Sequence, residues 1–201
     1  MRLLADKVGI VTGIGPGLGR LFALEAARMG ANVAMVSRSP GVMAEVAGQI
    51  AELGQASISL QADVTSQADC DRVVAETLDR FGRINGLVNG AYSPGPLAPV
   101  VELDYEAVAR AFDVTVFGAL RMVRAVAPVM EQQGGGSIVN VGSQVVRKYL
   151  HDNAGYAAGK AALSTFTRYL AIELGPKNIR VNTPAIGWTM SAPARAWLEQ
   201  Q

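Results

Sequence analysis

Tyr156 and Lys160 stand four residues apart at the start of a segment with helical periodicity, so both side chains lie on one face of a helix. Ser143 precedes the tyrosine by thirteen residues and directly follows an apolar, β-branched run. A tyrosine is a poor acid or base at neutral pH, because the reference pKa of a phenol is about 10. A nearby ammonium favours the phenolate, so the tyrosine and the lysine together could carry general acid–base chemistry.

The spacing of this tyrosine and lysine is weak support by itself, because amphipathic helices often pair the two residue types by accident. Their order along the chain adds weight. The predicted strands are followed in turn by a glycine-rich turn, by Ser143, and by Tyr156 with Lys160, so all of them lie at the carboxyl edge of the sheet. The carboxyl ends of the strands are where open α/β sheets bind their ligands.

The glycine-rich turn reads T-G-x-x-x-G-x-G, with one extra glycine, and lies between the first predicted strand and the first predicted helix. Glycines at such a turn let the chain bend tightly and let a phosphate approach the N–H groups of the helix N-terminus. The alternatives are a tight turn without a ligand and the nucleoside site of a methyltransferase. The residues expected to contact a cofactor here are Gly13, Gly15, Gly17, Leu18 and Gly19.

Ser37 and Arg38 end the second predicted strand, where a carboxylate would hold two ribose hydroxyls and repel a phosphate. A hydroxyl beside a guanidinium suits a 2′-phosphate instead. The pair therefore favours NADP over NAD, although NAD stays possible, and it speaks against methyl transfer. The alternative for Arg38 is an ordinary solvated arginine.

Short β-branched runs alternate with helical segments along the whole chain. Almost wholly apolar strands that alternate with helices predict a parallel sheet covered on both faces. We expect an α/β doubly wound parallel sheet (Rossmann fold) in a single domain, residues 1–201. The expected strands are 8–12, 33–37, 58–61, 84–89, 137–141 and 179–182, and the expected helices are 18–29, 42–53, 67–81, 105–132 and 156–174.

Composition narrows the function classes. The 201 residues carry a formal net charge of +1, which argues against a protein that coats nucleic acid or an anionic membrane. The single His151 rules out a multi-histidine metal site, and the single Cys70 cannot form an internal disulfide. No cluster of cysteine and histidine has metal-ligand spacing, so we expect no metal. No targeting or membrane segment is visible, so we expect a cytoplasmic location.

Several motifs in order resemble the classical short-chain dehydrogenases/reductases over essentially the whole length. The matching segments are 12–19, 63–64, 87–89, 138–143, Tyr156 with Lys160, and 179–182. The resemblance implies that Tyr156 passes a proton to or from the substrate oxygen, and that Ser143 hydrogen-bonds this oxygen. It implies that Lys160 holds the nicotinamide ribose and lowers the tyrosine pKa, helped by the positive charge of oxidised nicotinamide. Asp63 and Val64 would flank the adenine, and Asn89 would support the cofactor ribose region.

The chain departs from the family pattern at several positions. Tyr92 stands where the family keeps a glycine, so it either reshapes the pocket or is a harmless loop aromatic. Thr115 stands where the family has an asparagine that helps to hold a proton-relaying water. A threonine hydroxyl can still bind water, with less reach and a different geometry, so we expect activity to survive at a reduced level. The usual Pro-Gly is Ile186-Gly187, which leaves Gly187 and Thr189 as expected cofactor contacts. Relatives continue into a lid and a seventh strand, so we expect a sheet that lacks this strand. We expect that the chain is a fragment, and the alternative is a truncated relative with a partly open site.

The favoured function is therefore an NADP-preferring oxidoreductase that transfers hydride between nicotinamide and a secondary alcohol or ketone. Small residues along the last helix, and the resemblance, imply a homo-dimer or homo-tetramer. The expected catalytic residues are Ser143, Tyr156, Lys160 and Thr115. The alternative is a relative that binds the dinucleotide without turning it over and serves as a sensor or assembly subunit. The basic loop around His151 could attract an acidic substrate or simply be solvated.

Overall fold

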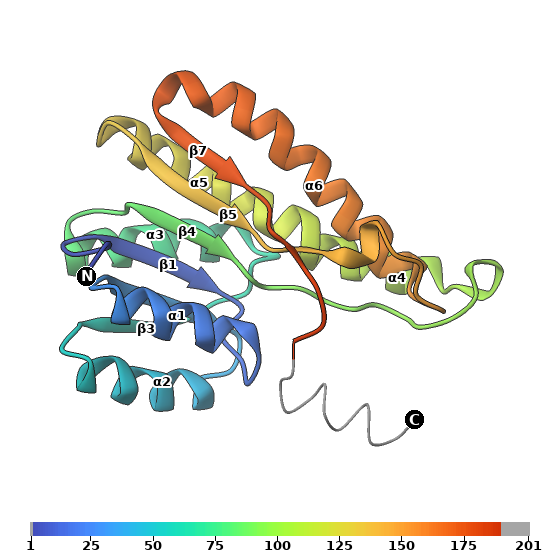
Figure 1. The fold of residues 1–201 in the computed structure, drawn as a ribbon, viewed down its shortest axis with the longest axis horizontal. Coiled ribbons are helices and arrows are strands. Elements are labelled where there is room, and N and C mark those ends of the chain that lie inside the picture. Colours follow the sequence, from blue (N-terminus) through green and yellow to red (C-terminus); the bar gives the residue numbers. More distant parts are fainter. Residues whose placement is uncertain (1, 190–201) are drawn as a thin grey trace.

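The computed structural model describes residues 2–189, and these form a parallel sheet of six strands in the order β3-β2-β1-β4-β5-β7 (Figure 1). The order reverses between β1 and β4, which creates the switch point at which such sheets bind ligands. The chain is thus the doubly wound α/β fold that its sequence predicts. The strands are β1 (Val8–Thr12), β2 (Asn32–Ser37), β3 (Ser57–Gln61), β4 (Gly86–Asn89), β5 (Gly136–Asn140) and β7 (Ile179–Asn182).

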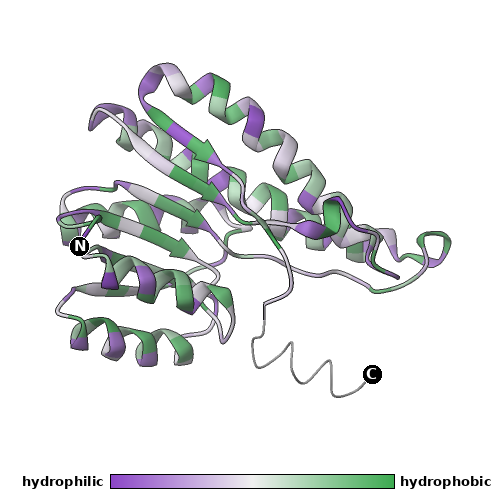
Figure 2. Ribbon diagram, in the orientation of Figure 1, coloured by the Kyte–Doolittle hydropathy of each residue, from purple (hydrophilic) through white to green (hydrophobic). Residues whose placement is uncertain are grey.

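Helices cover both faces of the sheet, and each face has its own buried apolar cluster. One cluster joins α1 and α2 to the sheet through residues such as Val33 and Met35. The other joins α3, α5 and α6 to the opposite face through residues such as Leu87 and Ile138. Figure 2 shows hydrophobic residues along the central strands and mixed residues along the helices, as expected for a sheet buried between amphipathic layers. The helices are α1 (Leu18–Arg28), α2 (Gly41–Glu52), α3 (Gln67–Phe81), α4 (Tyr105–Phe112), α5 (Gly118–Gln132) and α6 (Ala154–Leu174).

The region expected to be one helix over 105–132 is divided. A π-helical turn, η2 (Asp113–Phe117), joins α4 to α5, and Thr115 lies within this turn. A π turn inserts an extra residue into the helix and often lies at a functional site. Apolar periodicity could not reveal it, because the helical direction continues on both sides.

A second, two-stranded sheet lies beyond the carboxyl ends of the main strands. Its strands β6 (Gly142–Ser143) and β8 (Ala185–Ile186) pair in parallel, with Ser143 opposite Ile186. The chain also contains three short 3-10 turns: η1 (Val100–Glu102) before α4, η3 (Gln144–Val146) after β6 and η4 (Gly175–Lys177) after α6. The small sheet therefore brings the segment after β7 next to the predicted catalytic serine.

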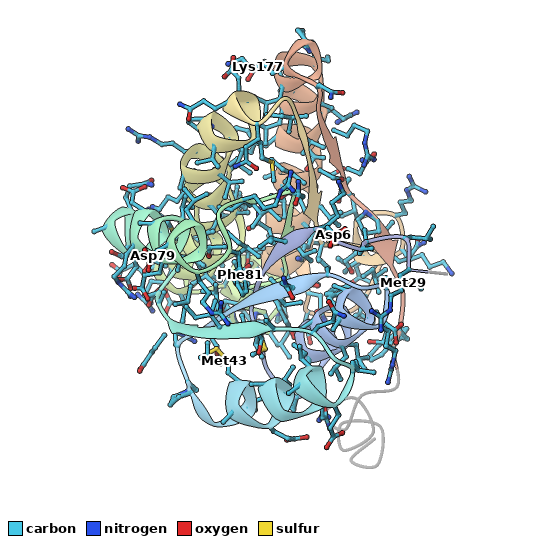
Figure 3. All side chains as sticks on the ribbon, turned by 90° about the vertical axis from the view of Figure 1, so that its left-hand side faces the viewer. Asp6, Met29, Met43, Asp79, Phe81 and Lys177 are labelled. Atoms are coloured by element: carbon cyan, nitrogen blue, oxygen red, sulfur yellow. The ribbon has the colours of Figure 1, made fainter. Side chains whose placement is uncertain are left out.

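The amino ends of the strands form the edge opposite to the predicted site. Figure 3 views this edge, where Asp6, Met29, Phe81 and Lys177 lie in the segments that lead into the strands. Within residues 2–189, β7 is the last strand on its side of the sheet. None of the helices in this described part of the chain is long and apolar enough to cross a membrane.

Candidate active site

Ser143, Tyr156 and Lys160 come together beyond the carboxyl ends of β4 and β5. Ser143 lies in β6, and its side chain hydrogen-bonds the hydroxyl of Tyr156, which projects from the first turn of α6. Lys160, one turn further along α6, donates from Nζ to the Val141 carbonyl oxygen at 2.6 Å. The structure thus places the predicted serine, tyrosine and lysine in one cluster.

Lys160 is an unusual lysine because its side chain is 3% exposed. Burial lowers the pKa of its amine to about 8, since the charged form loses hydration. The centroids of the Tyr92 and Tyr156 rings lie 5.6 Å and 5.8 Å from Nζ. Both separations are within the range of a cation–π interaction, so two aromatic faces support the buried ammonium.

The pKa of Tyr156 is raised rather than lowered in this structure. Burial is the main cause, and the hydrogen bond with Ser143 opposes it, while the neighbouring Tyr92 raises the pKa further. Lys160 was expected to lower this pKa, but its ammonium is directed to the Val141 carbonyl. Tyr156 is therefore protonated at neutral pH here, which is the form that donates a proton to a carbonyl oxygen.

The glycine turn contains two kinds of glycine. At Gly13, with φ +78°, a Cβ would lie 2.5 Å from the backbone nitrogen of Ala91, and at Gly19 it would lie 2.1 Å from the Gly13 carbonyl oxygen. At Gly15 and Gly17 a Cβ would meet no atom within 4 Å. The first two glycines are therefore explained by close packing of the chain, whereas the other two leave space above the backbone.

This space lies at the N-terminus of α1, whose N-cap Gly17 offers no side-chain hydrogen bond. The first turn of α1 also carries no acidic residue. Free N–H groups at a helix N-terminus attract phosphate, and bare glycine backbone allows close approach. The turn thus fits the pyrophosphate of a dinucleotide, and Leu18 begins the helix beside it.

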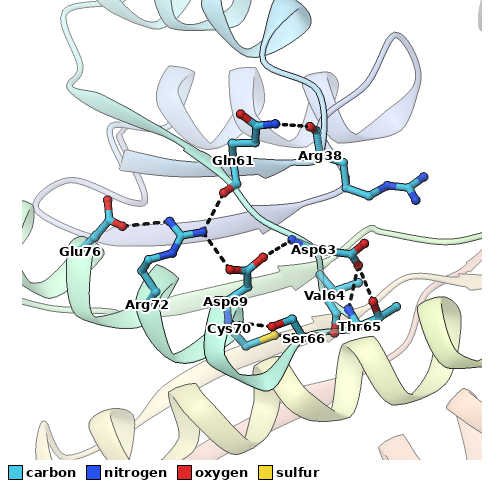
Figure 4. A network of polar contacts seen from close by, with 10 residues as sticks. All are labelled: Arg38, Gln61, Asp63, Val64, Thr65, Ser66, Asp69, Cys70, Arg72 and Glu76. Carbon is cyan, nitrogen blue, oxygen red and sulfur yellow. Dashed lines mark hydrogen bonds and ion pairs between the residues drawn. The ribbon is translucent and has the colours of Figure 1, made fainter.

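Arg38 follows β2 at the same edge, with an exposed side chain. Its carbonyl oxygen accepts a hydrogen bond from Gln61 Nε2 at 2.9 Å, and this contact fixes the backbone of the loop. Figure 4 shows its guanidinium pointing away from the neighbouring polar network, and it forms no hydrogen bond or ion pair with other residues in the range 2–189. The Ser37 hydroxyl accepts from the backbone N–H of Ser39 at 3.3 Å.

Asp63 lies in a loop that a polar network holds in place (Figure 4). Its backbone N–H donates to Asp69 Oδ2 at 2.8 Å, and its own carboxylate accepts from Thr65. That backbone N–H and the Arg72 guanidinium hold the pKa of Asp69 below its usual range. Val64 is buried beside this loop. Asp69 and Arg72, which the sequence did not single out, thus position the segment predicted to flank an adenine.

Asn89 uses its amide nitrogen for hydrogen bonds within the protein. The side chain is buried, and Nδ2 donates to Asn140 Oδ1 at 2.9 Å and to the Ala119 carbonyl at 3.2 Å. Asn140 in turn donates to Thr167 Oγ1 at 2.9 Å. The expected support of the ribose region by Asn89 would therefore act through the position of β4.

Thr115 uses its hydroxyl on the chain itself. Oγ1 accepts from the Ser93 backbone N–H at 3.0 Å and donates to the Ser93 carbonyl at 3.3 Å. The single hydroxyl proton of Thr115 is thus donated to the Ser93 carbonyl and not to the expected relaying water. Thr115 holds the loop after β4.

The segment after β7 lies beside the cluster. Because Ile186 pairs with Ser143, Gly187 follows directly next to the start of η3, where a Cβ on Gly187 would meet Gln144 Cγ at 3.8 Å. Thr189 ends the described part of the chain and is half-buried. Both residues remain predicted cofactor contacts.

A cavity of about 550 Å³ lies at the start of α6, and its lining residues include neighbours in sequence of Ser143 and Tyr156 but none of the three cluster residues. It is lined mostly by apolar groups from the loop before α6, the first residues of α6 and the segment before α4. His151 contributes a ring that packs edge-on against Tyr149 at 5.2 Å between centroids. The lining includes Ala98, Val100, Val145, Leu150, Ala154 and Ala157.

Comparison with known proteins places this geometry in a family. The profile of the short chain dehydrogenase family matches residues 7–201. Sorbitol dehydrogenase of Cereibacter sphaeroides is 40% identical over 185 residues, which cover 92% of this chain and 71% of that protein. The structure of NAD+-bound xylitol dehydrogenase is similar with a TM-score of 0.91 at 31% identity, over 98% of this chain and 75% of that one.

A further solved structure, 7α-hydroxysteroid dehydrogenase complexed with NADH and 7-oxo glycochenodeoxycholic acid, gives a TM-score of 0.90 at 31% identity. It covers 96% of this chain and 75% of that one. The chain therefore belongs to the short-chain dehydrogenase/reductase family. It is an oxidoreductase of the class that acts on CH–OH and C=O groups with a nicotinamide cofactor.

Proposed function

We propose that the protein is an NADP-preferring dehydrogenase/reductase that interconverts a secondary alcohol and a ketone, with Tyr156 as general acid and base. The observation that carries the proposal is the cluster of Ser143, Tyr156 and Lys160 at the carboxyl edge of the sheet. A protein that only bound the dinucleotide would have no need of this set.

The residues divide the chemistry among them. When bound, the nicotinamide supplies hydride transfer to or from the substrate carbon. Tyr156 donates its proton to the carbonyl oxygen in reduction and takes the hydroxyl proton in oxidation. Ser143 would hydrogen-bond the same oxygen, and Lys160 would hold the nicotinamide ribose and keep a positive charge near the phenol.

The preference for NADP rests on Arg38, whose exposed guanidinium lies unpaired within the described residues next to Ser37. A guanidinium recognises a phosphate with paired hydrogen bonds, whereas no carboxylate stands here to hold both hydroxyls of an NAD ribose. The solved relatives described above carry NAD+ or NADH, so this preference would set the chain apart from them.

The substrate proposal follows from the apolar cavity. Its aliphatic lining favours an alicyclic or other apolar alcohol or ketone, in the direction of the steroid that one relative binds. We also propose that the protein is cytoplasmic. We propose a homo-dimer or homo-tetramer, because α6 exposes Phe166 and Ile172, which a second copy would cover.

The acid–base assignment is tested by Tyr156→Phe, with Tyr169→Phe on the exposed side of the same helix as the control. Turnover of a secondary alcohol that the wild type oxidises should fall by roughly 10²–10⁴-fold in Tyr156→Phe. The control should keep full activity. Full activity of Tyr156→Phe would refute the assignment. A wild type that binds NADPH but turns over no alcohol or ketone in a broad screen would favour the alternative of a non-catalytic binding protein.

The cofactor preference is tested by titrating NADPH and NADH against nicotinamide fluorescence. Arg38→Gln should weaken NADPH binding by roughly tenfold, since a charge-assisted bond contributes about 1.5–3 kcal/mol, and should leave NADH nearly unchanged. Arg28→Gln, at the other end of α1, should change neither affinity. Tighter binding of NADH than of NADPH by the wild type would reverse the proposed preference.

A further inference from the structure

Tyr92 enters the active site from a different element than the tyrosine and lysine of α6. It lies just beyond β4, and its ring centroid is 5.9 Å from that of Tyr156, with the planes tilted by 57°. The same ring lies 5.6 Å from Lys160 Nζ. Tyr92 thus touches both members of the predicted proton-transfer pair.

The backbone is fixed on both sides of Tyr92. On one side, the Thr12 hydroxyl oxygen accepts from the N–H groups of Gly90 and Ala91 at 3.1 Å and 3.3 Å. On the other side, Ser93 is held to Thr115 through both its N–H and its carbonyl. These backbone hydrogen bonds therefore keep Tyr92 at the site, although this residue is 57% exposed.

Lys160 gains from a second aromatic face. An ammonium has three N–H donors, and within residues 2–189 only the Val141 carbonyl accepts a hydrogen bond from this one. Both ring centroids lie within 6 Å of a cation that has lost nearly all of its hydration, and they lie 5.9 Å from each other, so the two rings form one aromatic wall beside it. A buried charge without enough partners is destabilised, and the quadrupole of an aromatic face offsets part of this loss.

We propose that Tyr92 is a positioning residue, whose ring holds the Lys160 ammonium and the Tyr156 ring in their working arrangement. The inference rests on the proposed function of Lys160 and Tyr156. It predicts that an aromatic ring is required at position 92 and that the Tyr92 hydroxyl is not.

The test compares Tyr92→Leu, which keeps apolar bulk without a π face, with Tyr92→Phe, which keeps the ring. Tyr105→Leu, an exposed tyrosine at the start of α4, is the matched control. Acylation of Lys160 by an amine-reactive reagent, followed by peptide mass spectrometry without nucleotide, should be severalfold faster in Tyr92→Leu alone. NADPH affinity should fall roughly three- to tenfold in Tyr92→Leu and stay within about twofold of wild type in Tyr92→Phe and in the control.

Equal labelling and equal NADPH affinity in wild type and Tyr92→Leu would overturn the inference while leaving the proposed function intact. Equal impairment of the Leu and Phe variants would assign the effect to the hydroxyl and would also overturn it. A wild type that binds neither NADPH nor NADH would refute the proposed function. In that case faster labelling in Tyr92→Leu would still support the contact between Tyr92 and Lys160.

Discussion

Alanine substitutions at Gly13 and Gly15 should separate the two roles that glycine has in one turn. At Gly13 the backbone is left-handed, which costs a residue with a Cβ about 1–2 kcal/mol. The added Cβ would also lie 2.5 Å from the Ala91 nitrogen and 2.6 Å from the Gly90 carbonyl carbon. These are backbone atoms of the loop after β4, so they cannot rotate away, and overpacking adds about 1–3 kcal/mol.

Gly15→Ala has neither problem. Its φ lies outside the left-handed region, and its Cβ would meet nothing within 4 Å. The free energy of unfolding should therefore stay within about 0.5 kcal/mol of wild type. If a phosphate lies against this backbone, the new methyl group occupies its space, and we expect NADPH affinity to fall by about tenfold, or 1.4 kcal/mol.

Two measurements on each variant distinguish these outcomes: thermal unfolding without nucleotide and NADPH titration by fluorescence. Gly13→Ala should unfold roughly 4–20 °C below wild type, because the combined cost is about 2–5 kcal/mol and each kcal/mol shifts the midpoint by about 2–4 °C in a domain of this size. Gly15→Ala should unfold at the same temperature as wild type and bind NADPH less tightly. Wild-type NADPH affinity in Gly15→Ala would refute the conclusion that the open space over this glycine receives the cofactor.

Two further substitutions address the lysine and the departure at Thr115. The pKa of Lys160 falls from 10.5 to about 8 on burial, so between these values the unfolded chain binds more protons than the folded one, and stability contributed at this site rises with pH. The destabilisation by the buried charge is complete below about pH 8, and the stability of wild type relative to Lys160→Met should therefore improve between about pH 8 and pH 10.5 in denaturant titrations. Thr115→Val should leave the Ser93 N–H and carbonyl without their partner, lower stability by about 1–3 kcal/mol and reduce turnover. Thr115→Asn should retain or raise turnover at saturating substrate, and unchanged turnover in both variants would show that the position is idle.

Local patterns were sufficient to predict the sheet, its strand runs and the glycine turn. Val8–Thr12 is apolar and is followed by closely spaced glycines, and such patterns depend on neighbours in sequence. The cluster of Ser143, Tyr156 and Lys160 was also predictable, because parallel strands deliver their carboxyl ends to one edge. What short-range patterns could not predict were the side-chain partners: the hydrogen bond from Asn89 Nδ2 to Asn140 joins residues 51 positions apart, and the expected role of Asn89 near the cofactor stays a prediction.

Contacts between distant elements explain the remaining differences. Thr115 was interpreted as a residue that binds water, but the π turn directs its hydroxyl to Ser93, 22 residues away in sequence. The expectation of a lowered pKa for Tyr156 assumed that the Lys160 ammonium is free to interact with the phenol. Burial dominates instead, and the ammonium is bonded to Val141. Both outcomes depend on tertiary packing that no motif encodes.

The buried polar side chains suggest how the sheet keeps α6 in register with the site. Asn89 on β4 donates to Asn140 on β5, and Asn140 donates to Thr167 on α6. One turn before Thr167 in α6, Leu163 accepts from the Thr167 hydroxyl, and earlier in the helix Lys160 reaches Val141, the residue after Asn140. Hydrogen bonds are directional and apolar contacts are not. These hydrogen bonds therefore fix the rotation of α6 about its axis and its position along that axis relative to β5. A helix free to slide by one turn would keep its apolar burial and carry Tyr156 away from Ser143, and the buried asparagines oppose that movement.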